Sequence, residues 1–172
     1  MRRLFLLRHA KSCWDDQSLD DFDRPLSRRG RRKAVAMGRH MERERLRPDI
    51  ILCSTARRTA ETLELVHGVL EGVPVSLEPD LYEAGRGDLV GRLRQLDDYL
   101  ASVLLIGHNP GLERLALSLT GGHGDGEAMA RLDEKFPTGS LAVLESDIGH
   151  WRELQDGTCR LASFMRPEDV ED

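Results

Sequence analysis

The stretch LFLLRHAKS, residues 4 to 12, joins a short apolar run to an arginine and a histidine. The apolar run is preceded by Arg2 and Arg3 and followed by small and polar residues, which predicts a short buried strand. Arg8 and His9 would then lie at the carboxyl end of this strand, the edge where open α/β sheets bind ligands. Ordinary capping of a strand end would explain the same residues, so this stretch alone leaves both interpretations open.

The same pattern of apolar strand, polar turn and helix occurs twice more. DIILCS, 49–54, is a second apolar run, and SVLLIGHNPG, 102–111, is a third that places His108 in a turn before a helix. Ser27 is expected to cap a helix over about 28–46, and Ser54 a second helix. The apolar face expected for that second helix is formed by Ala56, Ala60, Leu63, Val66 and Leu70.

The rest of the chain gives weaker signals. We expect a strand near 74–78, an irregular loop from Pro79, a helix near 88–100 and a glycine-rich loop at 121–126. The late strands are expected at 140–146, 150–154 and 159–164, the last two as a hairpin around Asp156 and Gly157. Strands alternating with helices predict an α/β fold, a three-layer sandwich whose mainly parallel central sheet is flanked by helices.

Length and composition limit the classes of protein. The 172 residues are enough for one domain, 1–172, with a full core. Three cysteines without a CxxC spacing argue against a disulfide framework or a zinc site and favour a reducing, cytoplasmic setting. No window resembles a membrane span or a signal peptide. The basic run at 24–33 adjoins an acidic run at 15–23, the net charge is -5 and only 5% of residues are aromatic, so no nucleic-acid partner is expected.

The three strand ends have similar polar residues. Arg8 and His9, the pair Arg57 and Arg58, and His108 each follow an apolar run. Because parallel strands end at one edge of a sheet, these groups can meet although they are far apart in the sequence. Guanidinium groups, imidazoles and helix amino termini together form an anion site, and phosphate suits such a site best.

Several kinds of phosphate chemistry do not fit. A cysteine phosphatase needs an arginine six residues after its cysteine, and Thr59 occupies that position after Cys53. DFDRP, 21–25, is a weak match to aspartate phosphatases, because a polar segment precedes it and a proline ends it. A nucleotide-binding P-loop is absent from the sequence, and no set of ligands has convincing metal spacing. An imidazole nucleophile remains, with His9 forming a phosphoramidate.

The motifs RHAKS, RPLSRRG, STARRTAET and GHNPG, in this order, resemble the histidine phosphatase superfamily, which has the phosphoglycerate mutase-like fold. The short length and the stretches DFDRPLS and KFPTGSLAVL are most similar to the phosphohistidine phosphatase SixA subgroup. The resemblance extends over nearly the whole chain. It implies a single histidine phosphatase domain that uses no metal and no cofactor.

The resemblance also implies roles for individual residues. His9 would be the phosphorylated nucleophile, while Arg8, Arg58 and His108 would bind the phosphoryl oxygens. The family pattern SxxxR selects Arg58 rather than Arg57. Glu83, in LYEAGRGD, is the candidate general acid, although a merely solvated loop glutamate would look the same. The candidate supporting residues are Arg24 and Asn109.

The expected function is therefore a metal-independent phosphatase acting through a phosphohistidine intermediate. Its first-choice partner is a phosphorylated substrate that bears phosphohistidine on a protein. The alternatives are a small-molecule phosphomonoesterase acting on a sugar phosphate or similar metabolite, and a phosphate- or phosphoprotein-binding module without turnover. The sequence does not indicate the oligomeric state.

Overall fold

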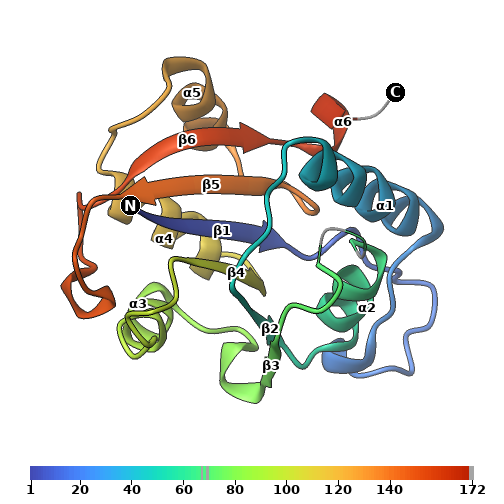
Figure 1. Cartoon of the computed structure of the whole chain (residues 1–172). Helices are drawn as coiled ribbons and strands as arrows, with labels where there is room; N and C mark the ends of the chain where they lie inside the picture. Colours follow the sequence, from blue (N-terminus) through green and yellow to red (C-terminus); the bar gives the residue numbers. More distant parts are fainter. Residues whose placement is uncertain (67, 69, 171–172) are drawn as a thin grey trace.

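A six-stranded sheet forms the centre of the computed structural model, which describes residues 1–66, 68 and 70–170. The strand order is β3-β2-β4-β1-β5-β6, with parallel pairing from β3 to β1 and antiparallel pairing from β1 to β6 (Figure 1). The strands are β1 (Arg2–Arg8), β2 (Ile50–Ser54), β3 (Val75–Glu78), β4 (Ser102–Gly107), β5 (Leu141–Ser146) and β6 (Arg160–Met165).

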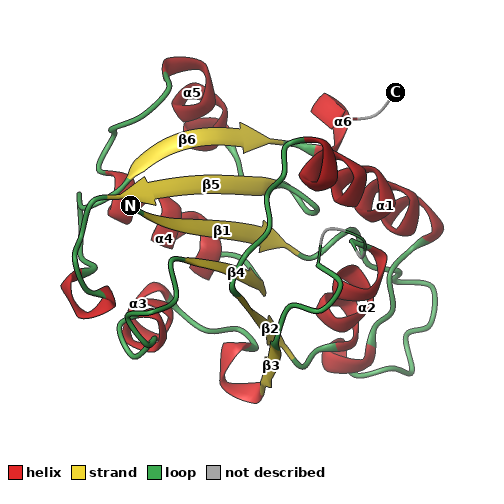
Figure 2. Cartoon of the chain, in the orientation of Figure 1, coloured by secondary structure: helices red, strands yellow, loops and turns green. Residues whose placement is uncertain are grey.

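Among the described residues, six α-helices and three short 3₁₀ turns lie between or after the strands (Figure 2). The helices are α1 (Arg28–Arg43), α2 (Arg57–Leu65), α3 (Arg86–Leu93), α4 (Gly111–Thr120), α5 (Gly126–Glu134) and α6 (Pro167–Val170). The 3₁₀ turns are η1 (Asp21–Asp23), η2 (Pro79–Leu81) and η3 (Trp151–Glu153). None of these helices combines the length and the apolarity that a membrane span requires.

The first strand shows how the layers form. Leu4 and Leu6 pack on one side of the sheet with residues of α3, α4 and α5, whereas Phe5 and Leu7 pack on the other side with residues of α1. Alternate side chains of a strand point to opposite faces, so a continuous apolar run is buried on both. The predicted three-layer α/β sandwich is confirmed.

The first two helices differ in how well the sequence predicted them. Ser27 caps α1 as expected, its Oγ accepting from Gly30 N at 3.0 Å, although the helix ends at Arg43 rather than near residue 46. The prediction that Ser54 caps α2 is wrong, because the position before this helix is Ala56. Of the expected apolar face, Ala56, Val66 and Leu70 are buried on either side of α2, and Ala60 and Leu63 are half-buried. The residues of α2 that are buried are Arg58, Thr59 and Thr62.

One further prediction from the sequence is wrong, and one helix was not predicted. Residues 150–154 form no strand but the turn η3, where Trp151 Nε1 donates to Leu100 O at 2.8 Å and buries the indole. The antiparallel partner of β6 is therefore β5. The glycine-rich loop leads directly into α5, which has no counterpart in the prediction and begins where Asp125 accepts from Ala128 N at 3.0 Å.

Candidate active site

The carboxyl ends of β1, β2 and β4 meet at one pocket, as the strand-end argument predicts. Its cavity volume is about 410 Å³. The pocket is lined by Arg8, His9, Lys11, Ser12, Trp14, Asp21, Arg24, Arg58, Glu83, His108, Asn109 and Thr138. Every residue proposed from the sequence for this site is present in that lining.

Two hydrogen bonds of its backbone and one of its ring hold His9 in place. Its N–H donates to Gly107 O at 3.1 Å, and its carbonyl accepts from Gly139 N at 2.9 Å. Ring nitrogen Nδ1 lies 2.7 Å from Ala10 O, an acceptor only, so Nδ1 has the ring hydrogen and Nε2 keeps its lone pair. Burial lowers the pKa of His9 to about 3. The hydrogen bond to Ala10 opposes this shift, and the charges of His108, Arg58 and Arg8 add smaller decreases. The imidazole is therefore neutral at physiological pH.

Arg58 lies directly beside His9. Its Nε is 3.4 Å from His9 Nε2, and its side chain is 5% exposed. Thr62 connects the two segments, because its Oγ1 accepts from Ala10 N at 3.0 Å and donates to Arg58 O at 2.7 Å. Arg57 instead is exposed and lies 3.5 Å from Glu61 in an ion pair on the outer side of α2. The structure thus brings Arg58, and not Arg57, into the pocket.

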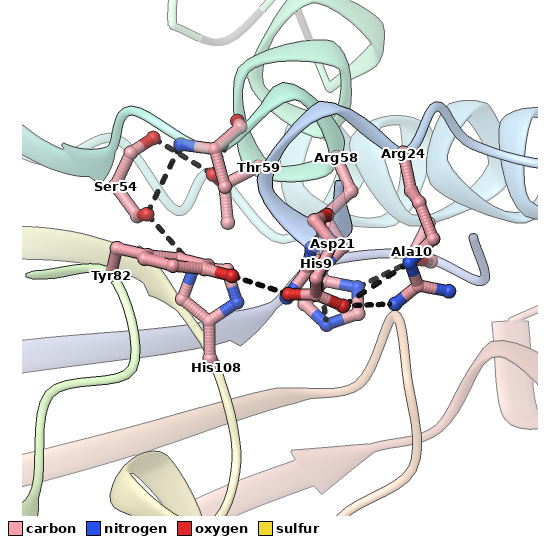
Figure 3. Close-up of polar contacts among 10 residues, drawn as sticks. His9, Ala10, Asp21, Arg24, Ser54, Arg58, Thr59, Tyr82 and His108 are labelled. Atoms are coloured by element: carbon pink, nitrogen blue, oxygen red, sulfur yellow. Dashed lines mark hydrogen bonds and ion pairs between the residues drawn. The ribbon is translucent and has the colours of Figure 1, made fainter. Parts of the chain in front are cut away.

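His108 completes the floor of the pocket with a ring centroid 5.3 Å from that of His9. Its Nε2 lies 2.8 Å from Ser54 Oγ, which also accepts from Ala56 N at 3.3 Å. When the Ser54 hydroxyl donates to His108 Nε2, the ring hydrogen lies on Nδ1. Figure 3 shows this nitrogen on the side of the ring that faces His9. Burial, with a smaller influence of Arg58, lowers the pKa of His108 to about 4.

Arg8 and Asn109 are joined through one carbonyl group. Arg8 Nη1 and Asn109 Nδ2 each donate to Phe136 O at 3.0 Å. Burial lowers the pKa of Arg8, and Glu113 opposes this shift. Within the described part of the chain, the buried atoms Arg8 Nε and His108 Nδ1 have no hydrogen-bond partner. Buried donors of this kind are costly unless an acceptor satisfies them, and phosphoryl oxygens are acceptors.

Asp21 is the site residue that the sequence reasoning missed. Its carboxylate accepts from Arg58 Nη2 at 3.0 Å, from Arg24 Nη2 at 2.8 Å and from the Tyr82 hydroxyl (Figure 3). The Tyr82 bond, with smaller contributions from Arg58 and Arg24, lowers the pKa of Asp21 to about 2, while burial and Asp21 raise the pKa of Tyr82 to about 12. Asp21 was visible only as part of DFDRP, with no signal connecting it to Arg58 or Tyr82.

Arg24 and Glu83 lie at the mouth of the pocket. Arg24 Cζ is 3.1 Å from the centroid of the Trp14 ring, so Arg24 supports both the acidic loop and an exposed indole. Glu83 has a backbone φ of 55°, which is unfavourable for a residue with a Cβ. This conformation turns the chain next to Tyr82 and leaves Glu83 in the lining. Strained backbone of this kind is found more often at functional sites than elsewhere.

The arrangement can bind an oxyanion and attack it. The neutral imidazole of His9 has its lone pair on Nε2, which accepts from Arg58 Nε at 3.4 Å. Two guanidinium groups and a second imidazole surround it, and these groups are suited to the charge on phosphoryl oxygens. Among the described residues, no group of three or more His, Cys, Asp or Glu side chains is arranged to hold a metal ion.

Comparisons with known proteins agree with this chemistry. The family model of the histidine phosphatase superfamily (branch 1) matches residues 4–110. The uncharacterized protein Rv1276c of Mycobacterium tuberculosis is 36% identical over 162 residues, which cover 94% of this chain and 99% of that protein. A solved structure from Agrobacterium tumefaciens, assigned as phosphohistidine phosphatase SixA, has a TM-score of 0.81 at 30% identity, covering 96% of this chain and 98% of that one. A second, from Nakamurella multipartitia, has a TM-score of 0.83 at 28% identity, covering 96% of each chain.

Proposed function

Because this chain belongs to the histidine phosphatase superfamily and is therefore a phosphatase, we propose that it hydrolyses protein phosphohistidine through a phosphohistidine on its own His9. The family expected from the motifs is confirmed, and the similarity is to SixA proteins within it. The observation that supports the proposal most is the bond from His9 Nδ1 to Ala10 O, which keeps the ring hydrogen on Nδ1 and leaves the Nε2 lone pair as an acceptor toward Arg58.

The reaction proceeds in two displacements. The lone pair of His9 Nε2 forms a bond to phosphorus while the bond from phosphorus to the leaving nitrogen breaks. That electron pair leaves with the substrate imidazole, which takes a proton from solvent and departs as a neutral ring. Water then attacks the phosphorus while the bond from phosphorus to His9 Nε2 breaks; the electron pair returns to Nε2, the protons of water pass to phosphate and solvent, and His9 is neutral again. Arg8, Arg58 and His108 stabilise the charge on the equatorial oxygens in both steps.

We propose protein phosphohistidine as the substrate because it needs little help from an acid. An imidazole leaves far more readily than an alkoxide, so hydrolysis is possible without a strongly positioned proton donor. The two solved structures described above are named as phosphohistidine phosphatases SixA, which supports the same class. The whole chain would act as one catalytic domain, since all six strands belong to one sheet.

A second candidate is a small-molecule phosphomonoesterase. Glu83 favours it, because a carboxyl group in the pocket lining could protonate a leaving alkoxide. A binding module without turnover is not favoured, because His9, Arg8, Arg58 and His108 together can carry out the attack on phosphorus.

One assay distinguishes these candidates. Phosphate release is measured from a phosphohistidine peptide and from a panel of phosphate esters, each with and without a chelator. We expect the highest kcat/KM on the phosphohistidine peptide and no effect of the chelator. A preference for one ester would favour the phosphomonoesterase, and activity restored only by a divalent metal would contradict the metal-independent mechanism.

We also propose a cytoplasmic setting. Cys13, Cys53 and Cys159 are free thiols, which fits a reducing compartment. Cys53 is buried, and its burial raises the pKa of the thiol to about 12, so it is protonated and unreactive.

A further inference from the structure

A second groove lies next to the catalytic pocket, and its lining is strongly basic. Its cavity volume is about 350 Å³. Two of its lining residues are acidic, Glu134 and Glu168, whereas six are basic: Lys11, Arg29, Lys33, Arg131, Lys135 and Arg166. The chain as a whole has a net charge of -5, so this concentration of cations is a local feature and not a result of the composition.

Part of this positive charge is already used within the protein. Arg166 forms ion pairs with Asp169 at 2.9 Å and with Glu168 at 3.3 Å, and Arg131 donates to Phe164 O at 2.9 Å. In the described part of the chain, the side chains of Lys11, Arg29 and Lys135 form no ion pair, and all three residues are exposed. These three cations face solvent from different segments along the groove.

The groove and the catalytic pocket are adjacent, because Lys11 and Thr138 line both. The backbone fixes their relative positions. Ser27 N donates to Lys11 O at 2.9 Å, and a Cβ on Gly30 would come within 2.1 Å of that same carbonyl oxygen, so the start of α1 packs directly against Lys11. On the other wall, Gly139 N donates to His9 O. The groove thus stands at a fixed distance from the nucleophile.

We propose that this basic groove binds an acidic segment of the phosphorylated protein that the enzyme dephosphorylates. This inference rests on the proposed function and adds to it the recognition of residues that flank the phosphohistidine. Separate cations from the start of α1, the end of α5 and the loop after β1 suit several carboxylates on an extended segment better than one compact anion. The catalytic pocket binds the phosphoryl group, and the groove selects the protein that bears it.

The test uses charge reversal at two residues that line the groove but not the catalytic pocket, R29E with K135E. The matched control is R39E with R160E, which makes the same change in net charge at exposed positions outside both linings. The substrates are two phosphohistidine peptides, one flanked by aspartate and glutamate and one by serine and alanine. A small phosphoramidate that is too short to reach the groove reports the basal activity.

For the parent enzyme we expect a KM about tenfold lower for the acidic peptide than for the neutral one, with a difference that shrinks as salt rises. R29E with K135E should remove that difference, leaving kcat and the hydrolysis of the small phosphoramidate unchanged. The control variant should behave as the parent. Equal KM values for both peptides in the parent, or equal effects of the two double variants, would overturn the proposal.

A binding measurement tests the groove independently of phosphate hydrolysis. Fluorescence anisotropy of a labelled, unphosphorylated acidic peptide should show binding to the parent and the control but not to R29E with K135E. If this binding is observed but phosphohistidine is not hydrolysed at all, the proposed function is wrong, whereas the groove still binds acidic segments. If a single-stranded oligonucleotide displaces the peptide at lower concentration than free acidic peptide does, the assignment to acidic protein segments is wrong.

Discussion

The floor of the catalytic pocket and its rim are built in different ways. Arg8, His9 and His108 form the floor at or just after the ends of β1 and β4, where the sheet fixes the backbone. The rim consists of Asp21, Arg24, Tyr82 and Glu83, which come from η1, η2 and the residues that follow them. Backbone hydrogen bonds to residues 107 and 139 hold the nucleophile, whereas the rim is held mainly by side chains that meet at one carboxylate.

This difference suggests a division of tasks. A floor tied to a sheet holds reacting groups in one geometry, which phosphoryl transfer requires. A rim tied by side-chain contacts can change without disturbing the sheet. We therefore expect substitutions in the floor to affect every substrate, and substitutions in the rim to affect substrates differently.

The largest effect is expected at the nucleophile. His9→Ala should reduce turnover to the background of the assay and abolish acid-labile phosphorylation of the protein, as measured by intact-protein mass spectrometry. Circular dichroism should show an unchanged fold. His123→Ala, at an exposed loop histidine, is the matched control and should keep both properties. Stable labelling of the His9→Ala protein would remove His9 from this role.

The next largest effect is expected at Arg58, with Arg57 as its neighbouring control. Each charge-assisted hydrogen bond contributes about 1.5–3 kcal/mol, so Arg58→Ala should lower kcat/KM by about ten- to hundredfold or more on all substrates. Arg58→Lys should rescue poorly, because a point charge cannot replace the guanidinium fork. Arg57→Ala should stay within a few-fold of the parent, because this arginine is exposed. A large loss at Arg57 with a small one at Arg58 would contradict the position of Arg58 beside the nucleophile.

A smaller and substrate-dependent effect is expected in the rim. Glu83→Gln should impair the hydrolysis of alkyl phosphates about tenfold more than that of phosphohistidine, because only the alkoxide needs a strong proton donor. The measurement is the ratio of kcat/KM values on the two substrates. Equal losses on both would give Glu83 a structural or water-orienting role, and no loss on either would make it a bystander.

The smallest effect is expected from pH. Because the pKa of His9 lies near 3, well below the ordinary 6.5, the imidazole is already neutral at pH 5. The value of kcat/KM, corrected for ionisation of the substrate, should therefore stay level between pH 5 and 7. A fall towards acid with an apparent pKa near 6.5 would mean that the nucleophile is solvated in the working enzyme.

The same pKa predicts a change in stability. Between pH 6.5 and about 3 the unfolded chain binds a proton at His9 that the folded chain does not. The free energy of unfolding should thus fall as the pH falls through that window. Urea denaturation of the parent at pH 7 and pH 5 measures the change, which should be smaller in the His9→Ala protein.

The floor could be predicted from the sequence much better than the rim. Apolar runs fixed the positions of Arg8, His9 and His108, since parallel strands end together. Choosing Arg58 over Arg57 required the motif of the family, because both arginines lie off the apolar stripe and periodicity does not distinguish them. The residues buried within α2 itself are polar. Ser54 looked like a helix cap, although its hydroxyl lies against His108.

The rim depends on contacts that no local pattern encodes. Asp21 and Tyr82 are 61 residues apart, and their bond follows from how η1 and the residues after η2 come together over the sheet. The positive φ of Glu83 has no sequence signal either, since glycine or asparagine is usual in that conformation. Side chains held by tertiary contacts alone require the folded chain before they can be identified.

The two backbone bonds of His9 also have a consequence for biosynthesis. A ribosome makes the nucleophile before the peptide groups that hold it, because these belong to Gly107 and Gly139. Contacts so distant in sequence form late, after the intervening chain is available. A nascent or truncated chain that ends before Gly139 would therefore have its reactive histidine without the bonds that orient it, and phosphatase activity would begin only when the sheet closes around the first strand.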